Sequence, residues 1–110
     1  MPKKSFTQAE IWEYLKDNPL DVKVHIGDLE DLNGEDYIFF DYLTDRVIAY
    51  DNTADYVTSV QFTVCTRDFE RRKVLVKYLK QMFVGNVSYE HDFEHQYYLS
   101  RIQTDLFIYG

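Results

Sequence analysis

A strand pattern runs directly into a helix pattern in VTSVQFTVCTRDFERRKVLVKYLKQMF, residues 57–83, and this junction sets the architecture of the rest of the chain. Apolar residues occupy alternate positions at Val60, Phe62 and Val64, which is the period of a strand with one face buried. The residues between them point the other way: Ser59, Gln61, Thr63 and Cys65. We therefore predict a strand over residues 57–66.

The residues after this strand predict an amphipathic helix. Asp68 can cap it, and Gly85-Asn86 closes it. Apolar residues at helical spacing should face the sheet: Leu75, Val76, Leu79, Met82 and Phe83. The basic residues are left for solvent or a partner: Arg71, Arg72, Lys73 and Lys77. Such a run is ordinarily an exposed helix face; the alternative is that it docks on the acidic loops of a neighbouring copy.

A second helix is predicted near the N-terminus, over Phe6 to Lys16. Thr7 and Glu10 have the spacing of a capping box, and Phe6 with Ile11 forms a hydrophobic staple. The helix should end at Asn18-Pro19. A half-buried strand is then expected over residues 22–26, because Val22, Val24 and Ile26 alternate with Lys23 and His25.

The middle of the chain predicts one central strand between two loops. Residues 37–42 are apolar on both faces, as expected of a strand covered on both sides. Residues 28–36 are acidic around Asn33-Gly34 and predict a loop. Residues 44–55 are rich in Asp, Asn and Thr and predict a long loop, in which residues 47–50 form a short strand or the tip.

After the second helix, a short strand over residues 87–89, a charged segment over 90–94 and an alternating strand over 98–109 complete the pattern. The predicted fold class is α+β: a mostly antiparallel sheet of four to five strands with two helices packed on one face. At 110 residues the chain is expected to be a single domain, residues 1–110.

Composition excludes several classes of function. The net charge of −7 disfavours a duplex-DNA reader and an anionic membrane surface. Cys65 is the single cysteine, which suits a reducing compartment and rules out an internal disulfide. No signal peptide and no apolar run of bilayer length is visible, so we expect the protein neither exported by that route nor embedded in a membrane.

For each candidate chemical site, an ordinary structural role explains the residues better than a chemical function does. We therefore assign no catalytic, cofactor-binding or metal-binding residue. Residues 91–95 match the H-x-x-E-H string of zinc peptidases, with His91, Glu94 and His95, but precede a strand rather than lying on a helix. The acidic loop 28–36 fails the register of an EF-hand. Whether either segment binds an ion stays open.

The remaining reactive residues also favour ordinary structural roles. Cys65 has no base beside it in the sequence, and His25 is interpreted as a surface strand residue. No glycine-rich phosphate loop is present. Surplus tyrosines in edge-like segments fit either an interface or an ordinary surface: Tyr89, Tyr97 and Tyr109.

The order of these elements resembles the tail terminator or tail completion proteins, also called minor tail or "minor capsid" proteins, of long-tailed phages and prophages of Gram-positive bacteria. The resemblance covers roughly residues 36–110 and lies in YIFF (37–40), YDNT (50–53), VQFTV (60–64) and TRD (66–68), followed by the amphipathic helix and the aromatic strand. It implies a non-enzymatic virion protein, made in the bacterial cytoplasm, that forms a hexameric ring. The ring would cap the tail tube and join it to the head-completion protein, and the free protein could stay monomeric until assembly.

The resemblance transfers no catalytic or binding residue, because the matching residues form the fold. Two other functions therefore stay open. A small intracellular ligand-binding or regulatory module would have the same fold, and a metal-dependent hydrolase would lose activity on changing Glu94.

Overall fold

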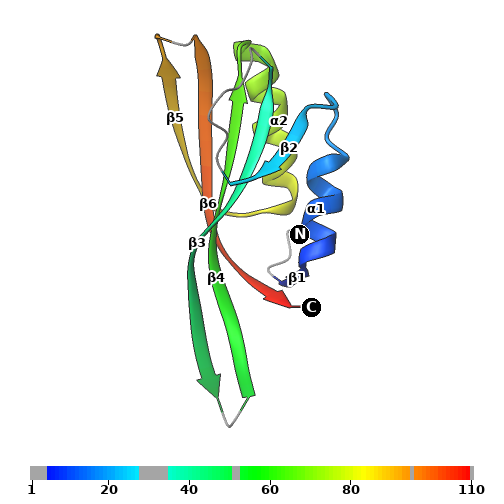
Figure 1. The fold of residues 1–110 in the computed structure, drawn as a ribbon, viewed down its shortest axis with the longest axis vertical. Helices are drawn as coiled ribbons and strands as arrows, with labels where there is room; N and C mark the ends of the chain where they lie inside the picture. The colour runs from blue at the N-terminus through cyan, green and yellow to red at the C-terminus, as the bar shows by residue number, and fades with distance from the viewer. Residues whose placement is uncertain (1–4, 28–34, 51–52, 95, 110) are drawn as a thin grey trace.

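The computed structural model describes residues 5–27, 35–50, 53–94 and 96–109, of which residues 5, 43–50, 53–58 and 107–109 are described by their backbone (Figure 1). Along the chain the elements are β1 (Ser5–Thr7), α1 (Gln8–Lys16), β2 (Lys23–Ile26), β3 (Tyr37–Tyr50), β4 (Thr53–Thr66), α2 (Phe69–Met82), β5 (Asn86–Asp92) and β6 (Tyr97–Tyr109).

The strands form one mostly antiparallel sheet in the order β1-β6-β4-β3-β2, with β5 also paired to β6. β5 pairs with residues 97–103 of β6 and β1 with residues 107–109, on the edge of β6 away from β4. Six strands therefore make a sheet that is five strands wide. The pairs β3–β4, β4–β6 and β5–β6 are antiparallel, which confirms the predicted fold class.

Both helices pack on one face of the sheet, as predicted (Figure 1). Ile11 and Leu15 of α1 and Leu75 and Leu79 of α2 share one core cluster with the inward side chains of β3, β4 and β6: Ile38, Phe40, Val60, Phe62, Val64, Ile102 and Leu106. A smaller cluster lies on the opposite face and contains Tyr37, Phe39, Cys65 and Tyr97. Within the predicted strand 37–42, residues 37–40 are thus buried on both faces, as the sequence indicated, whereas Tyr42 is exposed.

The helix starts follow the predicted capping chemistry. Thr7 caps α1, and the reciprocal hydrogen bonds with Glu10 form a complete capping box. The prediction that the helix includes Phe6 was wrong, because Phe6 lies in β1, paired in parallel with β6. Asp68 caps α2 by accepting a hydrogen bond from the Glu70 amide. That helix ends at Met82, earlier than Gly85-Asn86.

The long loop predicted over residues 44–55 was wrong, whereas the alternative that residues 47–50 form a strand is confirmed. β3 runs through to Tyr50 and β4 begins at Thr53, so the segment is a two-stranded β3–β4 arm, defined here as residues 44–50 and 53–58 (Figure 1). A register shift between Tyr42 and Thr44 inserts one extra residue into β3 where the arm leaves the body of the sheet. Such bulges bend a strand and increase its twist.

Several other elements begin or end at residues that differ from the predicted ones. The predicted short strand 87–89 extends to Asp92 as β5, so that three of the five residues of the charged segment 90–94 belong to a hairpin with β6. β2 begins at Lys23 and is ended by Gly27, whose φ of +83° favours glycine. The predicted loop 28–36 lies outside the described residues except for its last two. Within the described part of the chain, the helices are too short or too polar to cross a membrane.

Candidate interaction surfaces

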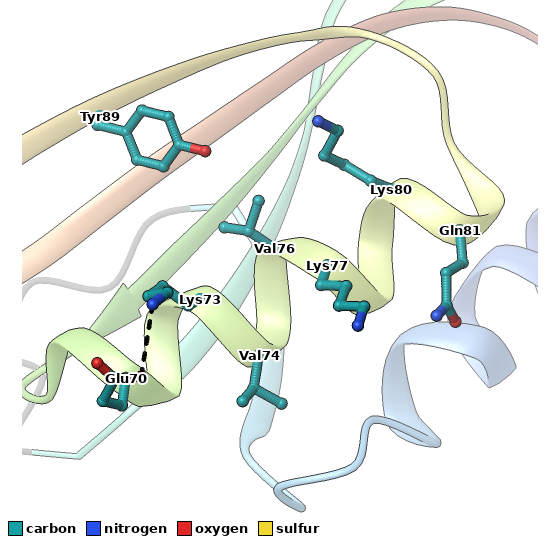
Figure 2. Close-up of a pocket in the computed structure, with 8 residues that line it drawn as sticks. All are labelled: Glu70, Lys73, Val74, Val76, Lys77, Lys80, Gln81 and Tyr89. Atoms are coloured by element: carbon teal, nitrogen blue, oxygen red, sulfur yellow. Dashed lines mark ion pairs between the residues drawn. The ribbon is translucent and has the colours of Figure 1, made fainter.

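An open groove of about 670 Å³ runs between α2 and β5 (Figure 2). The residues of α2 that line it include Lys73, Lys77 and Lys80, with Glu70 near the helix start. Tyr89 faces them from β5 and is 60% exposed. The groove therefore combines a positively charged helix face with an exposed aromatic ring.

The residues that line the groove also include exposed apolar surface, which comes from Val74 of α2 as well as from the Tyr89 ring. Val74 is 42% exposed, whereas Val76, two residues further along α2, is buried in the core. Lys73 makes an exposed ion pair with Glu70, with 3.7 Å between Nζ and Oε2. Exposed pairs of this kind contribute little to stability. Lys77 and Lys80 have no ion pair among the described residues.

Arg72 is the main departure from the sequence analysis, because only 8% of it is exposed although it was expected to face solvent or a partner. Its guanidinium carbon lies 4.9 Å from the ring centroids of Phe69 and Tyr89 and 5.4 Å from that of Tyr98. A cation over aromatic faces is attracted by the ring quadrupoles. Arg72 therefore joins α2 to β5 and β6 and fixes one wall of the groove.

The charge of Arg72 is not neutralised by a carboxylate in the part of the chain that the structure describes. Its Nε is buried and has no hydrogen-bond acceptor there, and the same holds for the hydroxyl of Ser100 on the neighbouring strand. An unsatisfied buried donor costs about 1–3 kcal/mol. The cation–π contacts with the three aromatic rings offset part of this cost.

The aromatic cluster continues along the β5–β6 hairpin. His91 stacks on Tyr98 at 4.3 Å with 3° between the ring planes, and Phe93 contacts His91 at 4.1 Å. Phe93 is 80% exposed. Tyr97, which we had grouped with the possible interface tyrosines, is instead buried in the cluster on the opposite face, while the side chain of Tyr109 lies outside the described set.

The H-x-x-E-H segment lies in this hairpin. His91 is in β5, Glu94 is in the turn, and His95 lies outside the described residues. The segment precedes β6, as predicted, but it does not follow a turn, because its first two residues, His91 and Asp92, belong to β5. Among the residues whose positions are given, no three His, Cys, Asp or Glu side chains gather as a metal site requires.

Only Glu35 and Asp36 of the acidic segment 28–36 are described, and both are engaged. Glu35 pairs with Lys23 at 2.7 Å, a hydrogen bond that lowers the pKa of the carboxyl, as does a second one from the Tyr37 hydroxyl. Asp36 accepts hydrogen bonds from the Arg67 amide and from Nε of Arg71 at 2.6 Å. Arg71, one of the basic residues expected to face solvent or a partner, is therefore an anchor for the start of β3.

The remaining candidate residues lie apart from the groove. Cys65 is 2% exposed, and burial, with smaller contributions from Asp36 and Asp92, raises the pKa of its thiol to about 12. The thiolate is thereby suppressed, as expected of a buried structural cysteine. His25 is partly buried and contacts the edge of the Phe39 ring.

No protein-family model matches the chain, and no curated protein sequence does. Its fold is similar to that of a chain in a solved structure, the virion of a native gene transfer agent (GTA) particle, with a TM-score of 0.66. The two chains are 12% identical, and the match covers 91% of this chain and 92% of the other. At this identity the likeness establishes the fold.

Proposed function

We propose that this chain is a structural component of a phage-like virion and that its specific role is that of a ring-forming tail terminator or tail completion protein. Two independent likenesses support the proposal. The fold matches a chain of a gene transfer agent virion over nine-tenths of both chains. The sequence resembles tail terminators in residues 37–40, 50–53, 60–64 and 66–68.

The observation that carries the proposal is the β3–β4 arm. Its last four residue pairs join residues 47–50 to residues 53–56, and no third strand pairs with them in the described structure. An isolated two-stranded ribbon is marginally stable in water. The arm follows the long axis of a molecule measuring 50 × 26 × 21 Å and points away from the helices (Figure 1). Such an element gains its support from another subunit.

The two outer strands of the sheet offer further surfaces for association. β2 pairs with β3 on one edge, and β5 pairs with β6 on the other. Outer strands leave backbone donors and acceptors available for a neighbouring chain. In the proposed hexameric ring, subunits meet through these edges and through the arm. The ring caps the tail tube protein and meets the head-completion protein on its opposite surface.

The proposed role is non-enzymatic, and we place the protein in the tail of the virion after its synthesis in the bacterial cytoplasm. Assembly of this kind needs no cofactor. The net charge of −7 supports contacts with proteins rather than direct recognition of nucleic acid.

The test is the mass in solution, measured by light scattering after size exclusion over a concentration series, with and without the tail tube protein. We expect a species of about six copies, alone or on the tube protein. A matched variant replaces residues 47–56 with Asn-Gly, because Arg46 and Val57 are register partners and this dipeptide favours two-residue hairpins. It should fold and stay monomeric. A wild-type monomer at every concentration, with tube protein present, contradicts the proposal.

A small ligand-binding module is the second candidate, and the α2–β5 groove is the observation that favours it. Its volume of about 670 Å³ is within the range of small-molecule sites. This candidate predicts a monomer in the same experiment and a ligand whose binding is lost on changing Tyr89.

A further inference from the structure

We propose that the α2–β5 groove receives the β3–β4 arm of a second copy of this chain. The inference rests on the proposed function, because it requires copies to associate, and it names the two surfaces that meet. Three features of the molecule support it: the chemistry of the groove, the chemistry of the arm and their places in the fold.

The groove is suited to an occupant that is both acidic and apolar. Lys73, Lys77 and Lys80 lie along its α2 side, and Glu70 is the acid among its lining residues (Figure 2). Val74 and Tyr89 expose 42% and 60% of their surfaces there. Apolar contact would favour association, while the lysines select a partner that carries carboxylates.

The sequence of the arm has that composition. Its two strands read TDRVIAY (residues 44–50) and TADYVT (residues 53–58), with two aspartates, one arginine and the apolar run Val47-Ile48-Ala49-Tyr50. The arm is thus an acidic segment with substantial apolar content, on a chain whose clustered lysines line the groove. The complementarity is between two parts of the same sequence, which identifies a second copy as the occupant.

Geometry directs the contact to another chain rather than to the same one. The arm and the α2–β5 groove lie toward opposite ends of the long axis, with the rest of the sheet between them (Figure 1). The contact is therefore heterologous: the arm of one copy enters the groove of the next. Repetition of a heterologous contact makes a closed ring when the rotation between subunits divides a full turn.

Arg72 positions one of the groove's side chains, Tyr89, for this contact. Its guanidinium lies 4.9 Å from the Tyr89 ring and holds that ring on the wall opposite the lysines. Its buried Nε lacks an acceptor within the described chain. A nearby carboxylate of an incoming arm would also interact favourably with this cation, which adds to the selection exerted by the lysines.

The first experiment places a photo-crosslinking amino acid at position 74, in the groove, and maps the products in a mixture of ¹⁴N- and ¹⁵N-labelled chains. The expected product joins position 74 of one copy to residues 45–57 of another. The matched control places the same amino acid at Glu13, an exposed position on α1, and should not reach the arm. Groove crosslinks to the tube protein, or to another region of a second copy, overturn the inference.

The second experiment reverses charges. The variant Lys73→Glu/Lys77→Glu should raise the concentration needed for ring formation by at least about tenfold, the change expected from losing close charge pairs at an interface. An equimolar mixture with Asp45→Lys/Asp55→Lys should recover association, since each mixed contact again has opposite charges. A ring that forms with unchanged concentration dependence in the groove variant overturns this inference alone. A wild-type chain that never forms a ring overturns the proposed function as well.

Discussion

The rings of Tyr14 in α1 and Tyr78 in α2 stack with 4.4 Å between centroids and 7° between planes, and each hydroxyl donates a hydrogen bond to the other residue's main-chain carbonyl. The two donor–acceptor distances are 2.6 Å and 2.8 Å. The pair thus connects the two helices through two hydrogen bonds. It fixes how α1 sits beside α2 on the common face of the sheet.

Removing either hydroxyl should destabilise the fold modestly. Tyr14→Phe and Tyr78→Phe each delete one hydrogen bond and leave a carbonyl without its donor, so each should lower the free energy of unfolding by about 1 kcal/mol. Urea unfolding measures this. Tyr89→Phe is the matched control, because the Tyr89 hydroxyl is on an exposed residue, and it should change little. Strictly additive effects of the two changes would contradict a coupled pair.

The tyrosine pair should also make stability depend on alkaline pH. Burial, followed by the Tyr78 charge and hydrogen bond, raises the pKa of Tyr14 from 10.0 to about 12. Between these values the folded chain holds the proton that the unfolded chain has lost, so stability is complete below pH 10 and falls as pH rises toward 12.

Comparison of wild type with Tyr14→Phe isolates this dependence, because both retain Cys65. The variant should lose less stability than wild type between pH 10 and 12 in urea titrations. Parallel pH profiles would show that Tyr14 does not titrate with the expected shift.

The Cys65 thiol should be inert in the folded protein. Its burial and its pKa of about 12 predict that a disulfide reagent at pH 8 reacts only after unfolding. Thiol modification followed across a denaturant series measures this. Val74→Cys in a Cys65→Ala background places a thiol on exposed α2 and should react at once. Rapid reaction of native wild type would contradict the buried position.

The two described glycines should respond differently to alanine. A Cβ at Gly85 would lie 2.2 Å from the Gln103 carbonyl oxygen, so the backbone of β6 or the turn before β5 must shift. We expect a loss of about 2–4 kcal/mol, the range of severe steric changes. Gly27 has open space and a φ of +83°, so Gly27→Ala should cost about 1 kcal/mol of backbone strain. Equal losses would contradict this distinction.

Arg72 should stabilise the fold mainly through its packing among aromatic rings. Arg72→Ala removes the stem and the cation–π contacts and should cost about 1–3 kcal/mol, whereas Lys73→Ala on the exposed neighbouring position should stay within about 0.5 kcal/mol. Arg72→Met refills the cage without the unsatisfied Nε and should recover most of the loss. An Arg72→Met variant as unstable as Arg72→Ala would show that the cation itself is needed.

The sequence correctly predicted those elements that are specified by a few adjacent residues. The alternation around Phe62 gave the correct inward face of β4, and Thr7 with Glu10 located the start of α1 to within two residues. These signals depend on period and capping chemistry, which are contained in a few adjacent residues.

The arm was missed because its residues, rich in Asp, Asn and Thr, resemble a loop in isolation. Its strands are specified by cross-strand pairing, such as that of Val47 with Tyr56, and pairing is not visible in composition. β1 was missed for the same reason, since its partner β6 is about 100 residues away. The burial of Arg72 depends on rings from β5 and β6, which a helical wheel of α2 does not contain.

β6 completes the sheet between β4 on one side and β5 with β1 on the other, and this has a consequence during synthesis. Until residues 97–109 leave the ribosome, β1 and β5 have no strand to pair with and one edge of β4 is bare. Contacts of such long sequence separation form late and slowly. We therefore expect a nascent chain lacking these residues to remain unfolded, which delays assembly until β6 has been synthesised.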